Sequence, residues 1–212
     1  MNPIFISFYS GDSYYEKCSN NLHFMCKSLG IEIEIEKSGG YREYWKNTLH
    51  KPSFIYDKLI TLRRDLIWID VDTEISQYHD VFKKWDSDIL FASHTGDLQG
   101  IKASPLCIKY NERSLMFLES LKDICLEKII NNDIDFDHDV LKYVLLPRFR
   151  GKIWIDVMKD KDFTSNDFSD GKIISNGISR VRDKHVYTRD VLRKNIKRSN
   201  EFDSCNLKDF LI

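Results

Sequence analysis

Two aspartates separated by one residue follow a run of apolar side chains near the middle of the chain. Asp70-Val71-Asp72 comes directly after residues 66–69, which are all apolar. Where the chain turns at the end of a strand, both carboxylates can converge on one cation. Hard oxygen ligands suit Mg²⁺ or Mn²⁺, and such a cation keeps open positions for phosphate oxygens. The pattern therefore predicts a divalent-metal site that neutralises a diphosphate leaving group.

A second acidic cluster, Asp137-His138-Asp139, stands directly before apolar residues at helical spacing. Aspartate is a favoured N-cap residue, and acids are favoured in the first turn of a helix. One interpretation is therefore structural, with Asp137 capping a short helix that Pro147 stops. The alternative is that these carboxylates act on a ligand, and the residues alone do not separate Asp137 from Asp139 in that role.

The elements ahead of the first acidic pair predict how it is positioned. Residues 4–8 are expected to form a strand ending in a turn at residues 9–12, and an amphipathic helix then runs to Gly30. Residues 31–36 alternate apolar and acidic, which is the period of a half-buried strand. Such a βαβ unit leads to a parallel sheet, whose ligands bind beyond the carboxyl ends of the strands. This placement favours a site at Asp70 over the alternative of solvated turn acids or helix caps.

The remaining pattern predicts an α/β fold with a mostly parallel central sheet flanked by helices. A second helix is expected to start at Pro52, and residues 66–69 are typical of a central parallel strand covered on both faces. The other expected elements are strands at residues 88–93, 101–110, 152–157 and 172–175, helices at 115–129 and 137–145, a polar exposed loop at 159–171 and a basic stretch at 180–198.

Composition limits the class of protein. With 212 residues and 42% hydrophobic content, the chain can bury one substantial core, so we expect a single domain over residues 1–212. A net charge of −1 gives no reason to expect a nucleic-acid partner. No apolar run approaches the roughly 20 residues that span a bilayer. The five cysteines have no CxxC spacing and no secretory signal is visible, so we expect a cytoplasmic protein without structural zinc.

Three segments together resemble the GT-A fold glycosyltransferases, a Rossmann-like nucleotide-diphospho-sugar transferase fold. They are Ile67-Trp68-Ile69-Asp70-Val71-Asp72, Lys51-Pro52-Ser53-Phe54-Ile55 and the Tyr9-Ser10-Gly11 turn. Within that group the chain most resembles the small domains encoded by large algal DNA viruses. The resemblance implies transfer of a hexose from a UDP-sugar, UDP-glucose-like, to a glycan or glycoprotein acceptor, with Mn²⁺ or Mg²⁺ on the diphosphate. It also implies a nucleotide-binding half at about residues 1–95, an acceptor half at about 96–212, and the host cytoplasm as the location of a viral protein.

The same resemblance assigns roles to particular residues. Tyr9 and Ser10 would contact the nucleobase and ribose, with ordinary edge packing as the alternative for Tyr9. The cluster Asp137-His138-Asp139 resembles the acidic helix start that this family places beside the donor sugar and the acceptor hydroxyl. A carboxylate there can act as a general base or bind sugar hydroxyls. A surface position is the alternative for His138.

The third group of predicted site residues lies near the end of the chain. In the resembling family a late strand returns toward the metal and often supplies a histidine, for which His185 is the candidate here. It lies several residues past the turn at 177–179, so Asn176 or water is the alternative third ligand. The basic stretch can balance a diphosphate, and Lys184 and Arg189 are the predicted phosphate contacts. A solvated helix face is the other interpretation of this stretch.

Two rival functions remain from the sequence. Asp70-Val71-Asp72-Thr73 also matches the DxDxT of haloacid-dehalogenase-like phosphatases, in which the first aspartate accepts the phosphoryl group. That motif normally ends the first strand of its domain, whereas here a complete βαβ unit precedes it, and no late acidic pair such as GDxxxD follows. A nucleotide-sugar-binding module without catalysis is the non-enzyme alternative. P-loop and dinucleotide-binding motifs are absent from the sequence.

Overall fold

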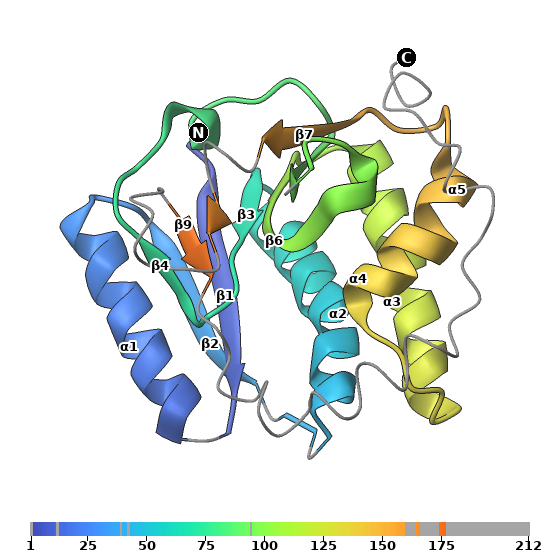
Figure 1. Ribbon diagram of the computed structural model, residues 1–212, viewed down its shortest axis with the longest axis horizontal. Helices are drawn as coiled ribbons and strands as arrows, with labels where there is room; N and C mark the ends of the chain where they lie inside the picture. Colours follow the sequence, from blue (N-terminus) through green and yellow to red (C-terminus); the bar gives the residue numbers. More distant parts are fainter. Residues whose placement is uncertain are drawn as a thin grey trace.

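Six strands form the central sheet of the computed structural model, which describes residues 2–11, 13–38, 40–41, 43–93, 95–159, 164–165 and 174–176 (Figure 1). Their order across the sheet is β2 (Ile33–Ser38), β1 (Ile4–Ser10), β3 (Leu66–Trp68), β6 (Ile101–Ile108), β5 (Ile89–Ser93) and β7 (Ile155–Lys159). Of these strands, β6 alone runs against its neighbours, and the other pairings are parallel. The predicted α/β fold with a mostly parallel sheet is therefore confirmed.

Helices cover both faces of this sheet. Ile4 and Ile6 of β1 pack in one core with α2 (Tyr44–Leu62) and α3 (Glu112–Ile130), whereas Phe5 packs in a second core with α1 (Ser13–Ser28). Figure 1 shows α1 on one side of the strands and the α2–α3 pair on the other. This arrangement follows from the twofold period of a strand, which sends alternate side chains to opposite faces.

The apolar run before the acidic pair is explained by the same double cover. Leu66 and Trp68 belong to the core under α2, and Ile67 and Ile69 belong to the core under α1. β3 is parallel to β1, and all four side chains are buried. Asp70 therefore leaves the sheet at its carboxyl edge, which is where ligands bind in folds of this class.

Helix α2 begins eight residues earlier than its proline suggests. The sequence predicts a start at Pro52, but the helix runs from Tyr44 and contains Pro52 in its interior. A proline inside a helix removes one backbone hydrogen bond. Here Trp45, Leu49 and Ile55 are buried on the same side of the helix, and the packing of this apolar face outweighs that loss.

The segment after Asp137 also continues through a proline. It comprises α4 (Asp137–Val140), a π-helical turn η3 (Leu141–Leu145) and α5 (Leu146–Phe149). The prediction that Pro147 ends the helix is wrong, because Pro147 lies in the first turn of α5, where a missing N–H leaves little unsatisfied. The wider π turn just before it is the local adjustment that lets the chain continue.

A second, three-stranded sheet follows the acidic pair directly. Its order is β4 (Thr73–Ile75), β9 (Ile174–Asn176) and β8 (Thr164–Ser165), and the sequence predicts β9 but not the other two strands. β9 is antiparallel to β4, with Asn176 opposite Thr73. The late strand therefore returns to the residue next to Asp72. Two 3₁₀ turns, η1 (Asp80–Phe82) and η2 (Leu98–Gly100), complete the described elements.

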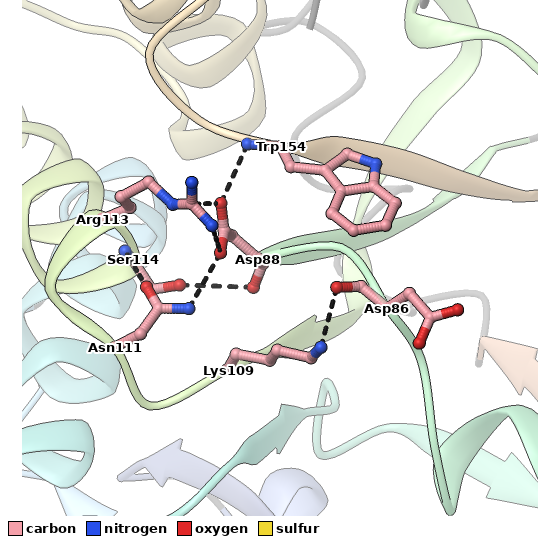
Figure 2. A network of polar contacts seen from close by, with 7 residues as sticks. All are labelled: Asp86, Asp88, Lys109, Asn111, Arg113, Ser114 and Trp154. Carbon is pink, nitrogen blue, oxygen red and sulfur yellow. Dashed lines mark hydrogen bonds and ion pairs between the residues drawn. The ribbon is translucent and has the colours of Figure 1, made fainter. Parts of the chain in front are cut away.

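A buried carboxylate ties three elements together at the amino end of β5 (Figure 2). Asp88 accepts hydrogen bonds from Asn111 Nδ2 at 2.8 Å, from Arg113 Nε at 2.9 Å and from the Trp154 backbone N–H at 2.9 Å. Its backbone carbonyl also accepts from Ser114 Oγ at 3.3 Å. We call this set the Asp88 network. It joins β5 to the start of α3 and to the segment before β7, on the edge of the sheet opposite to Asp70.

No helix in the described part of the chain is long and apolar enough to cross a membrane.

Candidate active site

Lys51 joins the two acidic motifs that the sequence places 67 residues apart. Its Nζ lies 3.0 Å from Asp70 Oδ1 and 2.8 Å from Asp137 Oδ2. The lysine side chain comes from the inner side of α2 and is 12% exposed, and that of Asp137 is 6% exposed. Burial favours loss of the lysine proton, but the two carboxylates outweigh it and raise the pKa of Lys51, so the ammonium is charged.

Three neighbours determine where the Asp70 carboxylate points. Trp68 Nε1 donates to Asp70 Oδ1 at 3.1 Å, and the Asp70 backbone N–H donates to Ser104 Oγ at 2.8 Å. The Lys51 ammonium also lies 5.5 Å from the centroid of the Trp68 ring, within cation–π range. Asp70 is therefore held from β3, β6 and α2, although its side chain remains 36% exposed.

Asp72 is the member of the acidic pair whose ionised form is disfavoured by its surroundings. Its burial, and next the nearby Asp70 carboxylate, raise its pKa from the usual 3.8 to about 7. A positive charge placed nearby would stabilise the ionised form of this carboxyl group. The donor set, two carboxylates at a strand end with an excess of negative charge, fits a hard divalent cation.

Asp70 and Asp72 are the two described residues that the sequence predicts as ligands of such a cation. No cluster of three histidine, cysteine, aspartate or glutamate side chains suited to a metal occurs among them. Oxygens from a diphosphate and from water would complete the coordination, as is usual for Mg²⁺. The predicted third ligand His185 lies outside the described residues, and nothing is described of the side chain of its alternative, Asn176.

The carboxylate of Asp137 does not cap the helix that it begins. The N-cap of α4 is Phe136, without a side-chain hydrogen bond, and Asp137 pairs with Lys51 instead. Burial opposes its ionisation, but the Lys51 ammonium and His138 outweigh this and hold the pKa of Asp137 well below its usual range. The structural interpretation of Asp137 as a cap is therefore wrong. Because Lys51 already pairs with this carboxylate, Asp137 is less suited than an unpaired carboxylate to act as a general base.

Asp139 differs from Asp137 in having no ammonium beside its buried Oδ2 among the described residues. Its side chain is 7% exposed, and its Oδ1 lies 3.3 Å from His138 Nε2. Its Oδ2 is buried and accepts no hydrogen bond from any described residue. Buried carboxylate oxygens are rarely left without a hydrogen bond. This atom is therefore suited to accept a hydrogen bond from a hydroxyl of a ligand.

Tyr9 and Ser10 share the carboxyl edge of the sheet with Asp70 but belong to β1 itself rather than to a turn. They pair with Lys37 and Ser38 of β2 and are half-buried. A Cβ placed on Gly40 would lie 2.2 Å from Ser10 Cβ, so the chain after β2 passes directly over this strand end. Their role in nucleotide binding stays a prediction.

The structure adds three residues that sequence reasoning did not select for the site, Lys51, Trp68 and Ser104. Lys51 lies in a segment that carries the family resemblance, which is the one signal that points to it. Trp68 also lies in such a segment, although its place in an apolar strand predicts only a core residue, and Ser104 has no signal at all. Of the remaining predicted residues, Lys184, His185 and Arg189 lie outside the described residues.

The sequence matches no protein-family model and no curated protein. The structure is similar to a glycosyltransferase involved in the glycosylation of the major capsid of PBCV-1, with a TM-score of 0.63 and 11% identity, covering 89% of this chain and 100% of that one. It is also similar to the glycosyltransferase GlyE of Streptococcus pneumoniae TIGR4, with a TM-score of 0.53 and 14% identity, covering 84% of this chain and 55% of that one. The apo form of GlyE gives a TM-score of 0.52 at 12% identity. The chain therefore shares its fold with solved glycosyltransferases.

Proposed function

We propose that this protein is a glycosyltransferase that transfers a hexose from a UDP-sugar to a glycan or glycoprotein acceptor. The observation that carries the proposal is the Lys51-centred cluster, which joins the Asp70 motif to the Asp137 motif at the carboxyl edge of the sheet. The shared fold supports it, because the similar solved structures are glycosyltransferases. The donor is proposed to be UDP-glucose-like, in line with the sequence resemblance.

In this proposal Asp70 and Asp72 hold Mn²⁺ or Mg²⁺ together with the diphosphate of the donor. A bound divalent cation neutralises the charge that grows on the departing UDP. Trp68 and Ser104 keep Asp70 in position for that role. Tyr9 and Ser10 lie farther along the same edge and would receive the nucleoside.

The acidic helix start would receive the sugar. Asp139 Oδ2, buried and unpaired among the described residues, would accept a hydrogen bond from a donor or acceptor hydroxyl. Asp137 would act with Lys51 as a fixed ion pair that orients the start of α4. His138, 3.3 Å from Asp139, would support that carboxylate. Lys184, His185 and Arg189 remain proposed contributors to the phosphates and the metal.

Two measurements separate this function from its rivals. Incubation with a panel of UDP-sugars and Mn²⁺, followed by assay of released UDP, should give turnover that chelator abolishes. A phosphatase would instead hydrolyse a simple phosphomonoester such as p-nitrophenyl phosphate, and a binding module would bind UDP without releasing it from UDP-sugars. Absence of UDP release with every donor, in the presence of a mixed glycan acceptor, would contradict the transferase.

A further inference from the structure

The ammonium of Lys51 occupies one oxygen of a predicted metal ligand. Asp70 Oδ1 lies 3.0 Å from Lys51 Nζ and also accepts from Trp68 Nε1, so this oxygen is already engaged in the protein alone. We propose that Lys51 makes cation binding conditional on the diphosphate, so that metal and nucleotide bind cooperatively and the metal alone binds weakly. This inference rests on the proposed function and goes beyond it, because it assigns a residue to the coupling between two ligands.

The charges around the predicted metal position explain the coupling. A divalent cation on Asp70 would lie a few ångströms from a buried ammonium, and repulsion between such charges is large where water is scarce. Asp137, at 2.8 Å from the same ammonium, offsets only part of this cost, because Lys51 still occupies Asp70 Oδ1 at 3.0 Å. A diphosphate brings additional negative charge to both cations, and so removes the penalty only when it is present.

The second partner of Lys51 explains why the lysine stays in place. Asp137 Oδ2, at 2.8 Å, is buried and would be left as an unpaired charge if the ammonium withdrew. Lys51 therefore cannot simply move away when a metal approaches. By linkage, the factor by which UDP strengthens metal binding equals the factor by which metal strengthens UDP binding.

Lys58 provides a matched control on the same helix. It is an ion-paired, 13% exposed lysine of α2, but its partners are Glu34 and Glu36 of β2 rather than the acidic cluster. Lys58→Met should remove a comparable charge without altering metal binding. A second comparison, Lys51→Met/Asp137→Asn against Asp137→Asn, removes the ammonium without leaving a buried carboxylate unpaired, and so protects the test against misfolding of the single variant.

The experiment is calorimetric titration of each folded protein with Mn²⁺ alone, UDP alone, and UDP in the presence of Mn²⁺. Wild type should bind UDP much more tightly with Mn²⁺ than without. Lys51→Met should bind Mn²⁺ alone at least about tenfold more tightly than wild type, and the UDP–Mn²⁺ coupling should shrink by a similar factor. The double variant should show the same gain relative to Asp137→Asn, and Lys58→Met should match wild type.

Two results would overturn the inference, and they differ from failure of the proposed function. Folded Lys51→Met, or the double variant, binding Mn²⁺ no more tightly than its reference protein would show that the lysine does not oppose the metal. Equal coupling in wild type and Lys51→Met would show the same. If wild type bound neither UDP nor Mn²⁺, the proposed function itself would fail, and the inference with it.

Discussion

Lys51 Nζ and Asp137 Oδ2 lie 2.8 Å apart and join the middle of α2 to the first residue of α4. Because the same ammonium is 3.0 Å from Asp70 Oδ1, one lysine connects both acidic motifs of the sequence. The pairing explains why Asp137 does not serve as a helix cap. The two acids of the helix start therefore have different surroundings. Asp137 is paired with the buried ammonium of Lys51, whereas Asp139 Oδ2 has no hydrogen-bond partner among the described residues.

This difference predicts opposite phenotypes for two neighbouring substitutions. Asp139→Asn should lower turnover of the UDP-sugar by at least about tenfold, because it removes a carboxylate suited to a sugar or acceptor hydroxyl. Its UDP affinity and thermal stability should stay close to wild type. Asp137→Asn should instead lower the free energy of unfolding by roughly 3 kcal/mol, because it leaves the Lys51 ammonium without its closest partner.

Steady-state kinetics, UDP titration and thermal denaturation of both variants check this pair of outcomes. Asp133→Asn serves as the control, because Asp133 pairs with Lys128 at the surface and has a 62% exposed side chain. Full turnover in Asp139→Asn, or wild-type stability in Asp137→Asn, would show that the two acids are assigned incorrectly.

The raised pKa of Asp72 predicts how the metal-free protein responds to pH. The folded pKa is about 7 and the usual value is 3.8, so between these values the folded state holds more protons than the unfolded state. Stability of the metal-free protein should therefore fall as pH rises through this window. Asp72→Asn removes this cost, and should raise the melting temperature at pH 8 by on the order of 5 °C.

The same substitution should have little effect near pH 4, where Asp72 is largely protonated in the folded protein. Thermal melts of wild type and Asp72→Asn, in chelator, at several pH values test this dependence. A stabilising effect that does not change with pH would mean that the substitution acts through packing rather than through the charge of Asp72.

The Asp88 network predicts a stability effect that is separate from the site. Asp88→Asn should lower the free energy of unfolding by about 2–3 kcal/mol, because it replaces a buried acceptor of Arg113 and of the Trp154 N–H. UDP affinity with Mn²⁺ should not change, since the network lies at the opposite edge of the sheet. Asp86→Asn is the matched control, because the exposed Asp86 contributes only its backbone carbonyl, to Lys109 Nζ. Denaturant unfolding and UDP titration measure both quantities, and a loss of UDP affinity with unchanged stability would contradict this assignment.

The parts of the fold that local pattern dictates are predictable from the sequence. Residues 66–69 are apolar on every position because β3 is covered on both faces, and Gly30 follows α1 with a left-handed φ of 67°. The start of helix α2 was predicted wrongly, because a proline such as Pro52 normally marks the first turn of a helix. Its buried residues Trp45 and Leu49 lie before the proline and show that tertiary packing decides the start.

The candidate site was predictable only in part, for a related reason. The acidic pair stands out because it directly follows an apolar strand, at the edge of a parallel sheet where ligands bind. A lysine on an amphipathic helix is normally solvent-facing, so nothing local marks Lys51 as 12% exposed and doubly paired. Ser104, whose Oγ accepts from the Asp70 N–H, enters the site through the pairing of β6 with β3, which is a property of the whole sheet.

Release of UDP from a UDP-sugar with Mn²⁺ in wild type, Asp72→Asn and Glu74→Gln measures whether Asp70 and Asp72 hold a cation on the donor diphosphate. Glu74 is an exposed acid of β4 two residues away and controls for loss of one negative charge. We expect Asp72→Asn to lose at least about a hundredfold in turnover while remaining folded, and Glu74→Gln to keep wild-type activity. Full turnover in Asp72→Asn, or undiminished wild-type activity in excess chelator, would contradict this role of the two aspartates.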